Sequence, residues 1–290
     1  MLGEVEKAGK EVYVIPGPHD INNYNAVTFT ETGYQPVPHV SAEGFASIYK
    51  SFGYGQAIAR DPSSLSYVAP LKENLWLLAI DAGLYAQNTR DTLVKAGAIT
   101  AESMGWIMEQ LRAAANNDIK VIGMMNHNLV EHHIGQGGSS PEDLLADWNA
   151  VADSLATAGL HVLFTGSADA IDAVRKPTPQ DQMVLDIQAG SPLVFPSTYR
   201  TVEISNGDAL KLSDLLIGSI AYDTGGSTFP EFAENYLDQS LNRLVPYQLQ
   251  AFNLTQEEIN QLQPLMTGGM KAFLSGSEAK AWEQVPDSTQ

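Results

Sequence analysis

The sequence predicts an α/β fold in which buried strands alternate with amphipathic helices. Two apolar runs, Leu75–Ile80 (LWLLAI) and Lys120–Met125 (KVIGMM), have the continuous pattern of strands that are buried on both faces. Between them, Thr100 starts a helix whose apolar side chains recur every three or four positions, at Met104, Ile107, Met108 and Leu111. A further strand over residues 161–165 (HVLFT) continues the alternation, which is typical of a layered α/β architecture.

The N-terminal part predicts short elements. A helix fragment ends at Gly9, and the β-branched and aromatic run at residues 12–15 (VYVI) predicts a strand. Residues 21–38 are rich in Asn, Thr, Gly and Pro, so we expect a long loop with little regular structure. Ser41 is the expected N-cap of the next helix, and residues 66–69 predict another strand.

The C-terminal half predicts one more long helix, then β-structure, then helices. We expect a helix over residues 141–158, because Pro141 suits its first position and Gly159 follows its end. Residues 182–203 predict strands around a Pro-rich turn, and residues 212–282 a mostly helical tail with a frayed end. Three tryptophans fall in apolar elements and are expected in the core, namely Trp76, Trp106 and Trp148.

Composition restricts the classes of function. The 290 residues carry a formal charge of −18 and no Cys, which excludes disulfides, thiolate metal sites and Cys nucleophiles. The chain shows no Lys/Arg stripe of the kind that neutralises phosphates, so we expect no nucleic-acid partner. No apolar run approaches the roughly 18 residues of a membrane helix, and the charged N-terminus does not resemble a secretion signal.

Three polar loops follow predicted strands directly. They are residues 16–20 (PGPHD), 126–128 (NHN) and 166–169 (GSAD). In α/β sheets, ligands bind beyond the carboxyl ends of the strands, so these loops predict one shared cleft.

At these loops the chain resembles the C-terminal two-thirds of a calcineurin-like metallophosphoesterase. VIPGPHD is similar to the family's VIPGNHD, MMNHN to the segment with its late His, and VLFTGSADAID to V-x-F-T-G-H-x-H-A-x-D. The resemblance covers residues 1–205 and implies a layered α/β sandwich that lacks its first strands. Residues 206–290 are then a mostly helical extension packed on that domain. Members of this family use two metal ions to activate a water molecule against a phosphoester.

The family's metal ligands are replaced in this chain. Pro18 stands where the family has Asn, Asn126 where it has the late His, and Ser167 and Asp169 where it has the two His of G-H-x-H. The D-x-H and G-D-x-x-D motifs have no match, so we expect no metal cofactor. Mn, Fe, Zn or Mg ions are implied only if the protein is active.

His19 and Asp20 remain from the motif G-N-H-D. In the family this His lies near the phosphate and assists the leaving group, steered by its acidic neighbour. The resemblance therefore implies that His19 and Asp20 are catalytic remnants. The alternative is a purely structural His that is hydrogen-bonded to Asp20.

Other polar clusters give competing hypotheses. Neutral imidazoles and a carboxylate suit Zn, which makes the histidines of HNLVEHH candidates, although adjacent His132 and His133 are poorly spaced for one ion. Asp169 and Asp172 suit a hard cation, or a turn. Arg200 either faced an ancestral substrate or pairs with an acid.

The function that we expect is non-catalytic: a degenerate phosphoesterase homologue that acts as a binding or structural module. The alternative is an active metal-dependent hydrolase whose missing ligands come from another chain or from a longer gene product. A subunit of a filament, layer or complex is a third class.

A small molecule is an expected ligand, and the resemblance implies an extracytoplasmic compartment, although no signal is present. The absent strands would leave residues 12–15 as an open sheet edge, so we expect a partner chain, a second copy or the helical tail to cover it.

Overall fold

The computed structural model describes residues 2–205 and 209–277. They form two compact units. The first comprises Met1–Ser167 and Ala173–Ile187, and the second comprises Ala168–Asp172 and Gln188–Gln290. The domain boundary predicted at residue 205 marks the end of the family resemblance. A division by compactness does not test it, so the boundary stays a prediction.

The first unit is built on a seven-stranded mixed sheet with the strand order β3-β4-β5-β6-β7-β9-β8. Its middle strands β5, β6 and β7 are parallel, and β4 runs antiparallel to β5. The predicted alternation of strands and helices is therefore confirmed. The strands are β3 (Ala59–Arg60), β4 (Tyr67–Lys72), β5 (Leu75–Ile80), β6 (Lys120–Met125), β7 (Val162–Thr165), β8 (Asp172–Thr178) and β9 (Gln182–Gln188).

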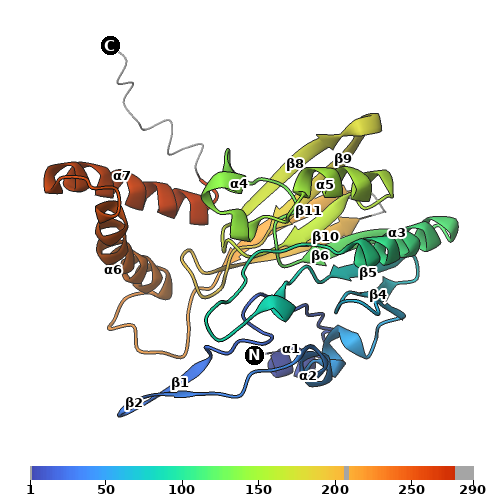
Figure 1. Ribbon diagram of the computed structural model, residues 1–290, viewed down its shortest axis with the longest axis horizontal. Coiled ribbons are helices and arrows are strands. Elements are labelled where there is room, and N and C mark those ends of the chain that lie inside the picture. The colour runs from blue at the N-terminus through green and yellow to red at the C-terminus, as the bar shows by residue number, and fades with distance from the viewer. Residues whose placement is uncertain (1, 206–208, 278–290) are drawn as a thin grey trace. The chain divides into compact units, whose positions relative to one another are not determined.

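Helices α3 (Ala101–Asn116) and α5 (Trp148–Thr157) cover one face of this sheet (Figure 1). The hydroxyl of Thr100 accepts the N–H of Ser103, as expected for the N-cap of α3. The main core cluster joins this helix layer to side chains of the strands, and the three tryptophans pack against it as predicted. Its members include Val68, Leu78, Ile80, Ile107, Leu111, Ala152, Leu155 and Leu163.

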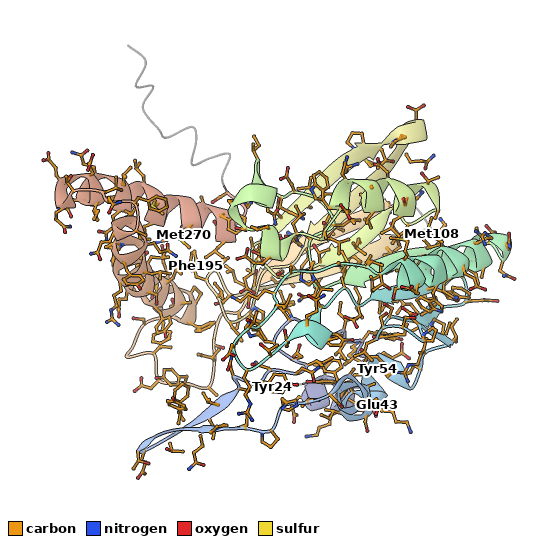
Figure 2. All side chains as sticks on the ribbon, viewed as in Figure 1. Tyr24, Glu43, Tyr54, Met108, Phe195 and Met270 are labelled. Atoms are coloured by element: carbon orange, nitrogen blue, oxygen red, sulfur yellow. The ribbon has the colours of Figure 1, made fainter. Side chains whose placement is uncertain are left out.

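A second layer lies on the opposite face. Successive strand residues point to opposite faces, so Val68 contributes to the first cluster and its neighbour Tyr67 to the second. Helix α2 (Ala42–Ile48), capped by Ser41 as predicted, adds Phe45 to this second cluster. Figure 2 labels Tyr54 in this layer and Met108 in the layer of α3.

The strand predicted over residues 12–15 is wrong. Among the described residues this segment has no ladder partner, and it packs on the second cluster. The N–H of Val14 bonds to the carbonyl of Phe52 at 3.0 Å, and the carbonyl of Val14 accepts the hydroxyl of Tyr67 at 2.9 Å. Single bonds of this kind satisfy the backbone without extending the sheet. The edges of the sheet are β3 and β8, so no open edge forms at residues 12–15, while a partner chain stays a prediction.

The loop predicted over residues 21–38 contains a hairpin instead. Strands β1 (Val27–Thr30) and β2 (Gly33–Pro36) pair antiparallel, with Phe29 opposite Tyr34. All eight strand residues are exposed. The alternation of this short segment lacks the apolar content by which buried strands are recognised.

The helix predicted over residues 141–158 is wrong in its first half. Residues 141–143 form a single 3₁₀ turn, and α5 begins only at Trp148. The intervening segment pairs with the loop after β6, because Asn128 N–H donates to Asp143 O and Leu145 N–H donates to Asn128 O. This tertiary pairing outweighs the local helix signal. Gly159, with φ 99°, ends the helix as predicted.

The second unit joins a hairpin to two long helices. Arg200 in the hairpin forms a two-pronged ion pair with Asp214 at 2.6 and 2.9 Å, so it pairs with an acid. The helices pack through Leu241, Val245 and Ile259. The helical C-terminal part is thus confirmed, except that residues 212–216 are a strand. The elements are β10 (Thr198–Ser205), β11 (Ala209–Leu216), α6 (Phe229–Gln250) and α7 (Gln256–Leu274).

Two short helices complete the described α-helices and strands, α1 (Leu2–Lys7) and α4 (Gln136–Ser139). In the described part of the chain, no helix has the length and apolar content needed to cross a membrane. The frayed end predicted beyond residue 282 lies outside the described residues.

Candidate functional site

The carboxyl ends of three parallel strands present polar residues at one edge of the sheet. Asp81 directly follows β5, Asn126 follows β6 and Gly166 follows β7. Because these strands are parallel neighbours, their following residues lie in a row. The N–H of Gly166 donates to the carbonyl of Asn126 at 3.0 Å, which ties two of the predicted loops together.

The loop at residues 16–20 reaches the same place. A methyl group placed on Gly17 would lie 3.3 Å from Nδ2 of Asn126 and 3.4 Å from Oδ2 of Asp20. Among the described residues, Oδ1 of Asn126 is buried without a hydrogen-bond partner. The first and second loops therefore meet at the Asn126 side chain, and the second and third at its backbone.

Asp20 shapes its own loop. Its carboxylate accepts the N–H of Gly17 at 2.7 Å, and its N–H donates to the Gly17 carbonyl at 3.2 Å. The turn that results leaves His19 exposed, and the carbonyl of His19 accepts from the Asn23 amide at 3.1 Å. In the described part of the chain, the ring of His19 has no hydrogen bond to Asp20. Their catalytic assignment stays a prediction, and so does Pro18 as a replaced ligand.

Ser167 is held by a residue that the sequence did not single out. Its hydroxyl donates to Oδ1 of Asp143 at 2.6 Å, and its backbone has a φ of 75°. A left-handed conformation at a non-glycine residue is uncommon and is maintained by its surroundings. Asp169, with φ 56°, is exposed and belongs to the second compact unit.

Asp81 is the most buried carboxylate at this edge, with 5% of its surface exposed. It accepts the N–H groups of Leu65 and Gly83, both at 3.0 Å, and the hydroxyl of Tyr85 at 2.7 Å. Burial raises the pKa of Asp81, while these hydrogen bonds oppose the shift. The position of this acid directly after a strand buried on both faces is the sequence signal that could have identified Asp81 as a candidate site residue.

His127 lies behind the same edge and is 1% exposed. Its Nε2 lies 2.8 Å from the carbonyl of Lys95, which requires the proton on Nε2 and leaves Nδ1 as an acceptor. Among the described residues Nδ1 has no partner, and a methyl group on Gly97 would overlap it. Burial lowers the pKa of His127, so the ring is neutral near pH 7.

A buried polar network anchors the second loop from below. Asp186 accepts the N–H groups of Leu129 and Val130 at 2.7 and 3.1 Å and the hydroxyl of Thr165. Nε2 of His132 lies 3.4 Å from the same carboxylate. Because these hydrogen bonds are buried, the network fixes the position of the loop that carries Asn126.

The histidines of HNLVEHH do not converge on one point. His127 bonds to Lys95, His132 lies against Asp186, and the ring of His133 lies 3.0 Å from the Ser139 hydroxyl. Glu131 accepts the N–H of Gly137 at 2.9 Å. These separate partners do not favour the zinc hypothesis.

The donor set does not fit the two metal ions that the resemblance implies. Metal ligands in such sites are carboxylates, imidazoles and amide oxygens that face one point. Among residues 2–205 and 209–277, no three His, Asp or Glu side chains gather in a way that could hold a metal ion. Ser167 donates its proton to Asp143 and Pro18 offers no side-chain donor, so two of the replaced positions supply no metal ligand.

Comparisons with known proteins give similarity in fold but not in sequence. No protein-family model matches the chain, and no curated protein matches its sequence. Among solved structures, a dimetal phosphatase from Danio rerio is similar, with a TM-score of 0.50 over 74% of each chain. Sequence identity is 12%, so this likeness concerns the fold alone. The chain therefore has the layered α/β fold seen in a dimetal phosphatase, with a helical C-terminal part.

Proposed function

We propose that this protein is a degenerate homologue of the calcineurin-like phosphoesterases that binds a ligand or partner without hydrolysing a phosphoester. One observation carries the proposal. The predicted loops meet at Asn126, whose Oδ1 has no hydrogen-bond partner among the described residues, and the nearby Ser167 hydroxyl donates to Asp143. The loops thus meet as in the fold that the chain resembles, but the side chains at their meeting point differ from that family's metal ligands.

The retained residues His19 and Asp20 cannot provide the rate enhancement that phosphoester hydrolysis requires. A two-metal site lowers the pKa of bound water from about 15.7 to about 7 and neutralises phosphoryl oxygens. A single general acid contributes only about 10²–10⁴-fold, and phosphate-ester hydrolysis requires far more. His19 is exposed, and among the described residues no hydrogen-bond partner positions its ring, so it supplies at most such a general acid.

Charge also favours a ligand other than a phosphate ester. Asp20 and Asp81 lie in this part of the first unit, and Asp143 bonds to Ser167. The whole chain carries −18, which repels anions over distances of about a Debye length. We therefore infer a neutral or cationic ligand.

The alternative function is an active metal-dependent hydrolase. The observation that favours it is the structural neighbour, which is a dimetal phosphatase. In this case the missing ligands would come from another chain or from a longer gene product. Mn, Fe, Zn or Mg ions would then be the cofactors.

Metal content together with activity distinguishes the two functions. The purified protein is incubated with Mn²⁺, Zn²⁺ or Fe²⁺, desalted and measured by inductively coupled plasma mass spectrometry. A generic phosphodiester assay is run in parallel. We expect clearly less than stoichiometric metal and no turnover above the rate without protein. Two equivalents of metal with chelator-sensitive turnover would establish the hydrolase instead.

A matched variant calibrates the metal measurement. Combining Pro18→Asn, Asn126→His and Ser167→His restores an amide and two imidazoles at three of the positions that the resemblance identifies. We expect this variant to bind more metal than the natural chain, because imidazole and amide groups are then added at the loops.

A thermal-shift screen tests the binding function. A ligand that binds the folded protein should raise its melting temperature, by an amount that mass action links to affinity.

A further inference from the structure

The β1–β2 hairpin has one apolar face and one polar face. Because side chains alternate along a strand, Val27 and Phe29 point to the same side as their cross-strand partners Pro36 and Tyr34. Phe29 is 83% exposed and Tyr34 is 69% exposed. A two-stranded hairpin is marginally stable in water unless a third element covers its apolar face. This face is therefore suited to a partner.

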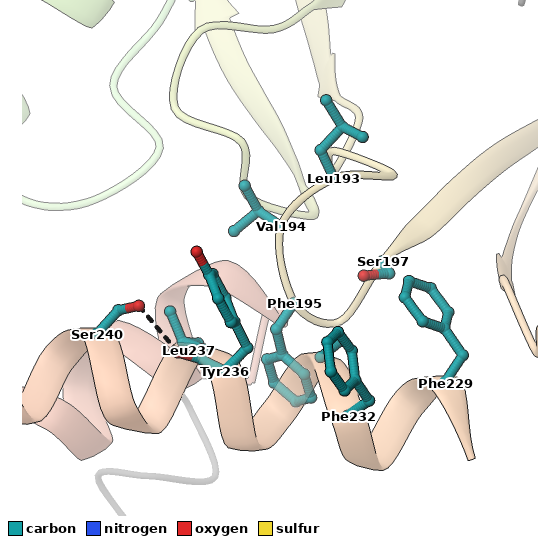
Figure 3. A pocket seen from close by; sticks show the side chains of 10 residues that line it. Leu193, Val194, Phe195, Ser197, Phe229, Phe232, Tyr236, Leu237 and Ser240 are labelled. Carbon is teal, nitrogen blue, oxygen red and sulfur yellow. Dashed lines mark hydrogen bonds between the residues drawn. The ribbon is translucent and has the colours of Figure 1, made fainter. Parts of the chain in front are cut away.

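The second unit contains a groove whose lining is mostly apolar, like the apolar face of the hairpin. One wall is the first half of α6, where the lining residues recur at helical spacing, and the other wall is the loop before β10. Tyr236 on α6 is 68% exposed and Leu193 on the loop is 92% exposed. Figure 3 shows the residues that face each other across it, namely Leu193, Val194, Phe195 and Ser197 of the loop and Phe229, Phe232, Tyr236, Leu237 and Ser240 of the helix.

We propose that this groove receives the apolar face of the β1–β2 hairpin from a second copy of the chain. The groove has a volume of about 320 Å³. A cavity of roughly 150 Å³ holds one benzene ring, so the groove has room for two rings. The hairpin face offers two, those of Phe29 and Tyr34.

Both surfaces belong to this chain and lack charged residues, which favours a second copy as the occupant. Two chains of −18 each repel one another, and most approaches would place acidic surfaces together. None of the residues that line the groove is charged, and neither are the eight residues of β1 and β2. Contact through these two surfaces lets the copies meet with little like-charge repulsion. Reciprocal exchange places each hairpin in the partner's groove and closes a twofold dimer.

The absence of Cys in the chain allows a direct test by disulfide trapping. Phe29→Cys and Tyr236→Cys are made as separate variants, one with a size tag, then mixed and treated with a mild oxidant. A disulfide requires Cα atoms about 4.4–6.8 Å apart. We expect a disulfide-linked dimer that contains one chain of each variant. The matched control is Tyr247→Cys, which is on the same helix and 74% exposed but outside the groove, and which should not cross-link to Phe29→Cys.

Sedimentation of the untreated protein provides an independent measurement. Replacing Phe29 and Tyr34 by Ser should weaken self-association at least about tenfold, because aromatic anchors dominate interface cores. The control Thr28→Ser with Gln35→Ser changes the polar face of the same hairpin and should leave association unchanged.

Three results would overturn the proposal. One is an intrachain disulfide in the double variant Phe29→Cys/Tyr236→Cys, which would assign the hairpin to the groove of its own chain. Another is cross-linking by Tyr247→Cys that equals that by Tyr236→Cys. The third is a wild-type protein that stays monomeric up to about 100 µM, since a specific interface with micromolar affinity would dimerise well below that concentration. The proposal does not depend on whether the protein hydrolyses phosphoesters.

Discussion

His127 is a buried residue whose charge state the fold controls. The ring is buried, its Nε2 is fixed by Lys95, and Gly97 leaves no room for rearrangement on the other side. Protonation would place a charge in this interior, with Asp81 and Asp143 offering only part of its compensation. The interior therefore selects the neutral ring.

This selection predicts a pH dependence of stability. The pKa of His127 in the folded state is lowered from its ordinary value of about 6.5, so below that pH the unfolded chain binds more protons than the folded one. The free energy of unfolding then falls as the pH decreases from about 6.5 towards the folded-state pKa, by at most about 1.4 kcal/mol per pH unit. Above about pH 6.5 this contribution is fully present.

The comparison of two Gln variants isolates this effect. His127→Gln keeps an amide donor for Lys95 O but cannot titrate, so urea unfolding between about pH 8 and pH 5 should show a shallower loss than in the wild type. His19→Gln makes the same replacement at an exposed His and is the matched control. Equal slopes in all three proteins would show that His127 does not titrate differently on folding.

The polar residues at the strand ends show what sequence can and cannot say about the site. Asn126 and Gly166 were predictable, because each follows a recognisable apolar strand. Asp143 was not, because it reaches Ser167 only through a backbone pairing with Asn128 that replaces a helix. The partners of a polar side chain are set by such non-local contacts, which local patterns do not contain.

At the scale of elements, the accuracy of prediction follows how local the determining forces are. Strands β5 and β6 were found at their observed ends because burial on both faces leaves a continuous apolar run. The helix starts at Ser41 and Thr100 were found because the cap is a contact between residues three positions apart. By contrast, residues 12–15 have strand composition but no ladder partner in the described part of the chain, and composition does not indicate whether a neighbouring strand exists.

The N-cap of α3 provides a prediction at this scale. The hydroxyl of Thr100 accepts the N–H of Ser103 at 3.2 Å, so Thr100→Ala should lower the free energy of unfolding by about 1 kcal/mol. Thr157→Ala, at the exposed C-terminal end of α5, removes only a bond to the carbonyl four residues before it and should be close to neutral. Urea unfolding at one pH measures both. A loss for Thr157→Ala as large as that for Thr100→Ala would mean that the cap has no special role.

At the scale of the whole molecule, net charge opposes both folding and association. The chain carries 34 acidic against 16 basic residues, and the exposed ion pairs of the described residues, such as Lys7 with Glu4, contribute little each. The excess of acidic groups must therefore be accommodated by solvent and salt. Stability should consequently depend on ionic strength more than it does for a balanced protein.

Raising NaCl from about 10 mM to about 150 mM shortens the Debye length from about 30 Å to about 8 Å. Repulsion between surface carboxylates is then screened, and we expect the melting temperature at pH 7 to rise by at least about 2 °C, equivalent to roughly 1 kcal/mol for a chain of this size. The control is the same salt series near the isoelectric point of about 4.5, where the net charge vanishes and the rise should disappear. An equal rise at both pH values would assign the salt effect to apolar burial and not to charge, because salts that strengthen burial act without regard to net charge.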